Sequence, residues 1–154
     1  MVYDRAWQEL GLVSPRKGSS ARRLHDFGRM VSELVEQDGV RRYTLGREPA
    51  YHNRLHIADT IVCMTYLLKT SAALNVPGAL KPATMAMALC IMAGHDFLHP
   101  GGTNTRPGEF EACAVQDLQP VMTAAGLTLA ERQTLKHCIM ATDPTRVKGI
   151  HLQV

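Results

Sequence analysis

The sequence carries its most apolar stretch at residues 82–96, which read PATMAMALCIMAGHD. Residues 83–94 present apolar side chains on every side of a helix, and Pro82 suits the first turn of one. A helix of this kind is stable in water only when other elements cover it. The stretch therefore predicts a central, buried helix that ends beside His95 and Asp96.

The segments around this stretch also have helical patterns. Apolar residues recur at steps of three and four over residues 20–38, and Gly39 is expected to end that helix. Further helices are expected over residues 54–74 and 112–125, and a capping box at residues 128–131 opens a last one. Strand-like alternation is absent, so the sequence predicts an all-α fold of roughly five or six helices.

The composition limits the class of protein. The 154 residues are 45% hydrophobic and 20% charged, with a formal charge of +3, which fits one globular domain over residues 1–154 and excludes a disordered chain. No apolar run reaches the roughly 20 residues that span a bilayer, and the N-terminus does not look like a signal peptide. We therefore expect a cytoplasmic protein that is not embedded in a membrane, with its four cysteines reduced and buried.

Three short segments concentrate the polar chemistry: YHNRLHIAD at 51–59, GHDFLHPGGTN at 94–104 and ATD at 141–143. In the first, a helix would place His52, His56 and Asp59 on one face, although such a group alone is more often an ordinary polar pair. In the second, a histidine and an aspartate end the most apolar helix, where burial without partners would be costly. A metal ion would provide that partner, because imidazole and carboxylate groups are common ligands.

These segments resemble signatures of a known family. Residues 51–59 look like the Y-H-N-x-x-H-x-A-D signature of the class I cyclic nucleotide phosphodiesterases, which belong to the HD superfamily. Residues 95–104 are similar to their H-D-x-x-H-P-G-x-x-N signature, and residues 141–143 to their A-T-D motif. The order along the chain is that of the family. The resemblance implies a compact, multi-helix fold of the HD/phosphodiesterase type.

The resemblance implies two divalent metal ions, Zn²⁺ with Mg²⁺ or Mn²⁺, held by His56, His95 and Asp96, with Asp96 bridging both. The family's fourth ligand lies well beyond the A-T-D motif, and only eleven residues follow Asp143 here. The C-terminal part of the family domain is therefore expected to be missing. Three explanations stay open: a fragment or frameshifted product, recruitment of Asp143 as the fourth ligand, or a metal-binding remnant without turnover. Asp143 also fits a helix-ending residue before Pro144.

The resemblance also implies catalytic roles for three side chains. His52 matches the general acid that protonates the leaving 3′ oxygen, and His99 matches a histidine that holds water at the metals. Glu111 matches the glutamate that orients the attacking water, with Glu109 as a competing candidate. The residues implied on the substrate side are Tyr51, Asn104 and Thr142, of which the first two also fit structural roles.

The expected activity is metal-dependent hydrolysis of a 3′,5′-cyclic nucleotide, cAMP or cGMP or both, to the 5′-monophosphate. Two alternatives stay open: a general HD-type phosphohydrolase acting on other nucleotides, and an inactive metal- or nucleotide-binding fragment. The expected partner is a small-molecule nucleotide rather than a nucleic acid. The charge is nearly balanced, and the basic residues lack the interleaved aromatic side chains of a base-stacking surface. A homo-oligomer is left open.

Overall fold

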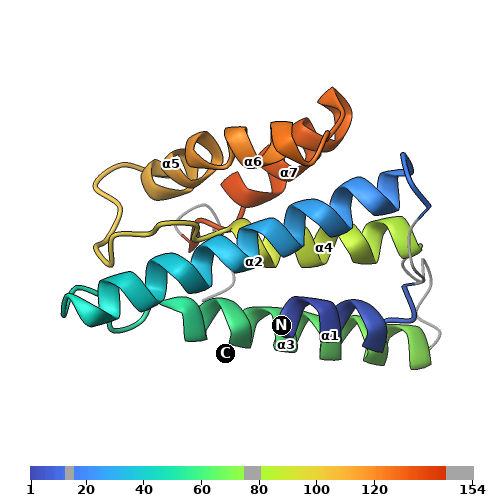
Figure 1. Ribbon diagram of the computed structural model, residues 1–154, viewed down its shortest axis with the longest axis horizontal. Coiled ribbons are helices and arrows are strands. Elements are labelled where there is room, and N and C mark those ends of the chain that lie inside the picture. The colour runs from blue at the N-terminus through green and yellow to red at the C-terminus, as the bar shows by residue number, and fades with distance from the viewer. Residues whose placement is uncertain (13–15, 75–80, 145–154) are drawn as a thin grey trace, which may run out of the picture.

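The computed structural model describes residues 1–12, 16–74 and 81–144. Every regular element in these ranges is a helix, so the predicted all-α fold is confirmed (Figure 1). The helices in chain order are α1 (Val2–Glu9), α2 (Ser20–Thr44), α3 (Arg54–Ala73), α4 (Pro82–Gly94), α5 (Glu109–Asp117), α6 (Gln119–Ala124) and α7 (Leu129–Met140).

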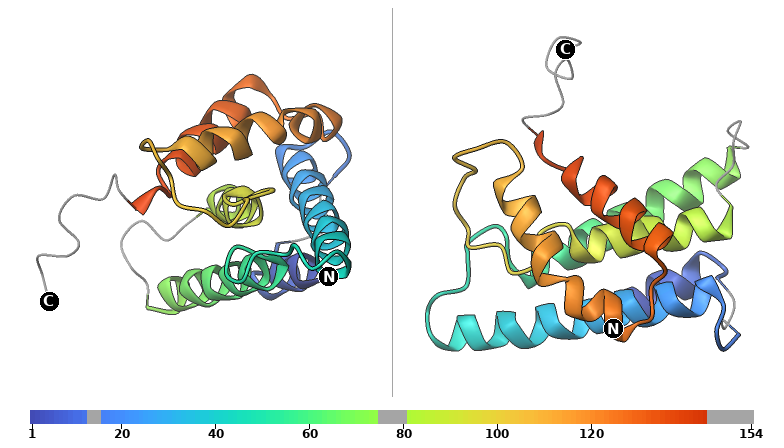
Figure 2. Two further views of the ribbon diagram at one scale, coloured as in Figure 1. Left: turned by 90° about the vertical axis from the view of Figure 1, so that its left-hand side faces the viewer. Right: turned by 90° about the horizontal axis from the view of Figure 1, so that it is seen from above.

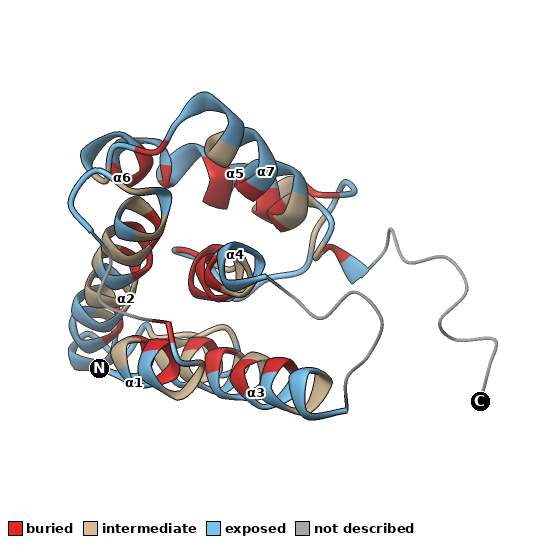
Figure 3. Ribbon diagram, turned by 90° about the vertical axis from the view of Figure 1, so that its right-hand side faces the viewer, coloured by how far each residue is buried: buried red, intermediate tan, exposed pale blue. Residues whose placement is uncertain are grey.

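Helix α4 lies in the middle of the molecule. Views along its axis show α1 and α3 on one side, α5, α6 and α7 on the opposite side, and α2 along a third (Figures 2 and 3). Leu89, Cys90 and Ala93 of α4 have no exposed surface. The predicted central helix is therefore confirmed, and its C-terminal end carries His95 and Asp96.

Helix α2 is longer than its sequence pattern predicts. It continues through Gly39 to Thr44, so the expectation that this glycine ends the helix is wrong. A Cβ atom at Gly39 would lie 3.0 Å from the side chains of both Arg54 and Glu48. The glycine therefore serves close packing of α2 against the start of α3, not termination.

The sequence pattern did not predict α1, which is short and packs through three side chains, Tyr3, Ala6 and Trp7. The Tyr3 hydroxyl donates to the Leu24 carbonyl of α2 over 3.3 Å. A Cβ at Gly28 would lie only 2.1 Å from the Tyr3 ring, so the absence of a side chain there makes room for it. A tyrosine and a glycine that lie 25 positions apart thus fit together, which no local pattern reveals.

The helix expected over residues 112–125 is divided into α5 and α6 at Leu118. Pro120 lies in the first turn of α6, where its missing N–H interrupts a continuous ladder. The predicted capping box of α7 is present: the Thr128 hydroxyl accepts from the Glu131 N–H, and the Glu131 carboxylate accepts from the Thr128 N–H.

The four cysteines are free, as expected, but they are not all buried. Cys90 is buried in the core, which raises the pKa of its thiol to about 12. Cys63 and Cys113 are exposed because they lie on the outer faces of α3 and α5. Among the described helices, none combines the length and apolar character that crossing a bilayer requires.

Candidate metal centre and active site

The start of α3 positions His56. The Asn53 side chain caps this helix, and its Oδ1 accepts from the backbone N–H groups of Leu55 at 2.9 Å and His56 at 3.0 Å. His52 precedes the cap, so the expectation that one helix stacks it on His56 and Asp59 is wrong. Asp59 is exposed. Because the helix begins only after Asn53, the His52 ring is free of the helical face and points toward Asp96 at the end of α4.

The end of α4 positions His95 and Asp96. The His95 Nδ1 lies 3.0 Å from the Met92 carbonyl, which can only accept, so this nitrogen carries the hydrogen. The other ring nitrogen, Nε2, lies 3.1 Å from Asp96 Oδ2. The His56 Nε2 lies 3.1 Å from the same oxygen. Two histidines from different helices thus converge on one carboxylate oxygen.

The charges in this cluster are strongly coupled. Burial disfavours the charged ring of His95, but the hydrogen bond and charge of Asp96 outweigh it and raise the pKa of His95. Burial also opposes ionisation of Asp96, yet His95 lowers the pKa of this carboxyl. Burial lowers the pKa of His56 in spite of the nearby carboxylate. The cluster therefore keeps Asp96 ionised and His56 neutral, the forms in which both groups can bind a cation.

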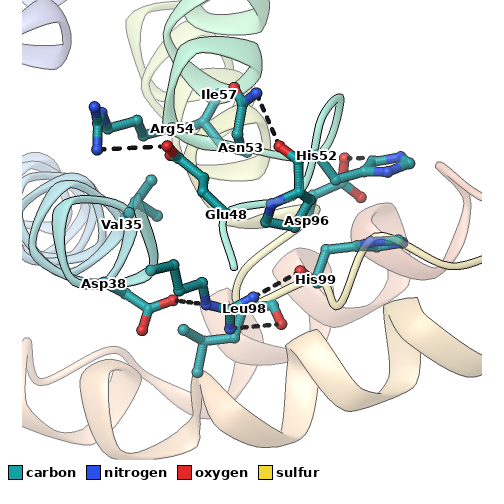
Figure 4. A pocket seen from close by; sticks show the side chains of 13 residues that line it. Val35, Asp38, Glu48, His52, Asn53, Arg54, Ile57, Asp96, Leu98 and His99 are labelled. Carbon is teal, nitrogen blue, oxygen red and sulfur yellow. Dashed lines mark hydrogen bonds and ion pairs between the residues drawn. The ribbon is translucent and has the colours of Figure 1, made fainter. Parts of the chain in front are cut away.

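His52 and His99 form a stacked pair at the same place. Their ring centroids are 3.8 Å apart and the rings are inclined by 24°. The backbone N–H of Gly101 donates to His99 Nδ1 over 3.0 Å, so the neutral His99 ring carries its hydrogen on Nε2. The His52 Nε2 lies 3.9 Å from Asp96 Oδ2. Figure 4 shows His52, Asp96 and His99 among the residues that line one pocket. The volume of this pocket is about 30 Å³.

The donor atoms fit a metal ion. Within the described residues, two groups of possible ligand atoms lie within coordination reach, His56–His95–Asp96 and His52–Asp96–His99. Because the Met92 carbonyl holds the hydrogen of neutral His95 on Nδ1, the lone pair of Nε2 faces the Asp96 oxygen. Two acceptors at this distance repel unless a proton or a cation lies between them. Asp96 belongs to both groups, as a bridging ligand would.

Glu111 and Glu109 are clearly distinguished. Glu111 is buried, with 7% of its surface exposed, and its Oε2 accepts from the Asn104 side chain over 2.9 Å. Its charge acts on both His95 and His99. Glu109 instead accepts from the backbone and hydroxyl of Thr105, which makes it a cap of the loop before α5. Of the two, Glu111 is therefore the carboxylate that faces the histidines.

The other predicted residues differ in how close they lie to this centre. Tyr51 is 66% exposed, and its ring centroid lies 4.6 Å from His56 and 4.9 Å from His52. Asn104 also accepts from the Phe110 N–H, so it braces the loop. The Thr142 hydroxyl donates to a carbonyl at the end of α7.

Asp143 is fully buried, and neither group of candidate ligand atoms in the described part of the chain contains it. Its role as a fourth ligand stays a prediction. Of the histidines expected to have no role in the site, His137 is exposed on α7 and His25 packs 4.8 Å from Trp7. His151 lies outside the described residues.

Sequence reasoning missed the contribution of α2. Asp38 and Arg42 line the pocket of Figure 4 together with His52 and His99. In the sequence, these two residues are an aspartate and an arginine four positions apart near the end of a predicted helix, a spacing that is common on solvent-exposed helix faces. Phe110, whose ring centroid lies 4.6 Å from that of His99, was also missed.

Comparison with known families agrees with this geometry. Residues 51–107, which hold all four clustered histidines and Asp96, match the family described as 3′5′-cyclic nucleotide phosphodiesterase. This segment is therefore similar to that family over about a third of the chain. The phosphodiesterase family consists of hydrolases of cyclic nucleotides, and the segment supplies both converging signatures of the site. No curated protein and no solved structure matches the chain.

Proposed function

We propose that the protein hydrolyses the phosphodiester of a 3′,5′-cyclic nucleotide, cAMP or cGMP, to the 5′-monophosphate, with two divalent cations. The single observation that carries this proposal is the convergence of His56 and His95 on one oxygen of Asp96, inside the segment that matches the phosphodiesterase family. Zn²⁺ suits the two imidazoles and the carboxylate, and Mg²⁺ or Mn²⁺ suits a site dominated by water.

We assign the first ion to His56, His95 and Asp96, and the second to Asp96 with water. The stacked rings of His52 and His99 favour this division. The lone pair of a ring nitrogen lies in the plane of its ring. The His52 and His99 ring planes are inclined by only 24° at a centroid distance of 3.8 Å, so their lone pairs do not point to one position within the roughly 2 Å of a metal–nitrogen bond. These two histidines are therefore left for protons and water. The ions would lower the pKa of a bound water and offset charge on the phosphate.

The protein side chains then divide the reaction between them. His52, which is partly exposed beside Asp96, holds a proton on Nε2 and gives it to the 3′ oxygen as the P–O3′ bond breaks. His99 and Glu111 orient the water whose oxygen forms the new bond to phosphorus, and Glu111 accepts its proton. Asn104 keeps Glu111 aimed at the site. Tyr51, an exposed ring beside His52 and His56, flanks the histidines on the solvent side. The product is a nucleoside 5′-monophosphate.

The test is hydrolysis of cAMP and cGMP by the purified protein with Zn²⁺ and Mg²⁺ or Mn²⁺. We expect 5′-monophosphate from the wild type and background rates from Asp96→Ala. His137→Ala is the matched control, because it removes an exposed histidine of α7 that lies outside the site. If Asp96→Ala retains the wild-type rate, the mechanism is wrong. A wild type that hydrolyses other phosphate esters and no cyclic nucleotide would favour the general phosphohydrolase.

The same assay tests the small-molecule nucleotide partner, and the cytoplasmic location stays a prediction from the sequence. The oligomeric state is a separate question, and sedimentation of the purified protein measures it directly.

A further inference from the structure

Arg42, in the last turn of α2, reaches across to the loop that carries His99. Its guanidinium donates from Nη1 to the His99 carbonyl over 3.1 Å and from Nη2 to the Leu98 carbonyl over 3.4 Å. The remaining donor, Nε, lies 2.5 Å from Asp38 Oδ2, one turn earlier on α2. All three guanidinium nitrogens thus have a partner, and two of them donate to consecutive carbonyls of one loop.

The loop needs such support. Leu98 has a φ of 58°, in the left-handed region that residues other than glycine rarely adopt. Its side chain is 37% exposed, so burial alone does not hold this conformation. A strained backbone of this kind persists only when the surrounding structure fixes it. The charge-assisted hydrogen bonds from Arg42 provide that restraint directly before the His99 ring.

We propose that Arg42, anchored by Asp38, is a positioning residue that fixes the His99 loop and thereby keeps the His99 ring stacked on His52. The inference deepens the proposed function, on which its catalytic consequence rests. Arg42 acts through the backbone of the loop and does not touch the reacting atoms. It lies outside residues 51–107, so the family signature does not contain it. Figure 4 shows Asp38, Leu98 and His99 gathered at this pocket.

The chain offers a closely matched control. Arg41 also pairs with Asp38, through Nη2 at 2.6 Å from Oδ1, but makes no hydrogen bond to the loop among the described residues. Arg41→Ala and Arg42→Ala therefore remove the same charge from the same turn and the same carboxylate. Only Arg42→Ala releases the carbonyls of Leu98 and His99.

The experiment records the ring ¹H–¹³C signals of the histidines by nuclear magnetic resonance in the metal-free protein at fixed pH. His52→Gln and His99→Gln variants assign the two signals. We expect Arg42→Ala to shift both signals, because the stacked rings separate, and to leave the His137 signal in place. Arg41→Ala should shift neither. Unchanged His52 and His99 signals in Arg42→Ala, or equal shifts in Arg41→Ala, would overturn the proposal.

Two milder variants keep the test decisive if Arg42→Ala fails to fold. Arg42→Lys retains a donor and should restore much of the wild-type position of both signals. Asp38→Asn removes the anchor of Arg42 and should shift them in the same direction as Arg42→Ala, by less. Shifts absent from Asp38→Asn and undiminished in Arg42→Lys would contradict the positioning role.

Hydrolysis gives the second readout. We expect Arg42→Ala to lower kcat about tenfold with KM changed less than about twofold, and Arg41→Ala to leave both within about twofold. Equal kcat values for wild type and Arg42→Ala would overturn the catalytic consequence. If the wild type hydrolyses no cyclic nucleotide, the proposed function fails, while the ring signals still decide whether Arg42 positions His99.

Discussion

Two carboxylates at opposite ends of the helical bundle, Glu131 and Asp96, show how differently a protein can treat a partly buried acid. Glu131 opens α7 and is surrounded by hydrogen-bond donors. Its oxygens accept from the side chains of Ser20 and Arg23 on α2 and from the backbone of Thr128. These donors lower the pKa of Glu131 to about 2 despite its burial. The cluster joins α2 to α7 and leaves its acceptors satisfied.

Asp96 ends α4 and faces the nitrogen atoms of histidines. One oxygen is shared by His56 and His95 at 3.1 Å each, and the hydrogen of neutral His95 is already directed to Met92. Such a cluster is satisfied by an added proton or cation. Donors and acceptors are matched around Glu131, as in a structural carboxylate, whereas Asp96 and the neutral His95 Nε2 face each other as acceptors and fit a shared proton or cation.

The largest expected effect is a loss of hydrolysis that distinguishes His52 from the metal ligands His56 and His95. His52→Ala should lower the hydrolysis rate on the order of 10²- to 10⁴-fold, because it removes the proton donor to the leaving oxygen. It should leave Zn²⁺ affinity within a few-fold, since the first ion is assigned to other ligands. Parallel activity assays and metal titrations measure both quantities, and His137→Ala serves as the control. Loss of Zn²⁺ binding in His52→Ala would contradict the division of roles.

The next effect concerns the metal ligands themselves. His56→Ala and His95→Ala should each weaken Zn²⁺ binding about 100-fold or more, because each removes a neutral nitrogen from a three-residue site. Competition with a chromogenic chelator gives the affinities. His25→Ala, which alters a histidine packed against Trp7, should bind as the wild type does. Equal affinities in all four proteins would show that the convergence on Asp96 is only structural.

Much of the fold follows from local patterns. The apolar run of α4 and the capping box of α7 were predicted because each depends on neighbours in sequence. The short helix α1 and the continuation of α2 through Gly39 were not. Both depend on contacts between distant segments, such as Gly39 with Arg54. Local periodicity carries no information about such contacts.

The candidate site shows the same limit. The predicted His56, His95, Asp96, His52 and His99 lie together because two signatures bring them to one place. The pattern misplaced His52 on the helix, since the capping role of Asn53 was not recognised. Arg42 was missed because an arginine four residues after an aspartate looks like an exposed pair until the His99 loop is seen beside it.

A smaller effect is expected from the structural carboxylate. Glu131→Gln should cost about 1 kcal/mol of unfolding free energy, because it removes the partly solvent-screened ion pair with Arg23 while the amide oxygen can still accept from the Thr128 N–H. Urea denaturation measures it. The same variant should bind Zn²⁺ as the wild type does. A change in metal affinity would break the distinction between the two clusters.

The smallest expected effect is the pH dependence of the Glu131 contribution to the unfolding free energy. Because the pKa of Glu131 is about 2 in the folded protein against an ordinary 4.5, its stabilisation is fully present above about pH 4.5 and is lost as the pH falls toward 2. The difference in unfolding free energy between wild type and Glu131→Gln should therefore shrink over this window. Denaturation series at several pH values test it, and a constant difference would contradict the account.

The central claim is that the Asp96 cluster is built to hold a cation. Calorimetric titration of the metal-free protein with Zn²⁺ tests it most directly, with Asp96→Asn as a nearly isosteric variant and Glu131→Gln as the control carboxylate. We predict saturable binding by the wild type, at least about 100-fold weaker binding by Asp96→Asn, and unchanged binding by Glu131→Gln. Equally tight binding by Asp96→Asn, or no binding by the wild type, would contradict the claim.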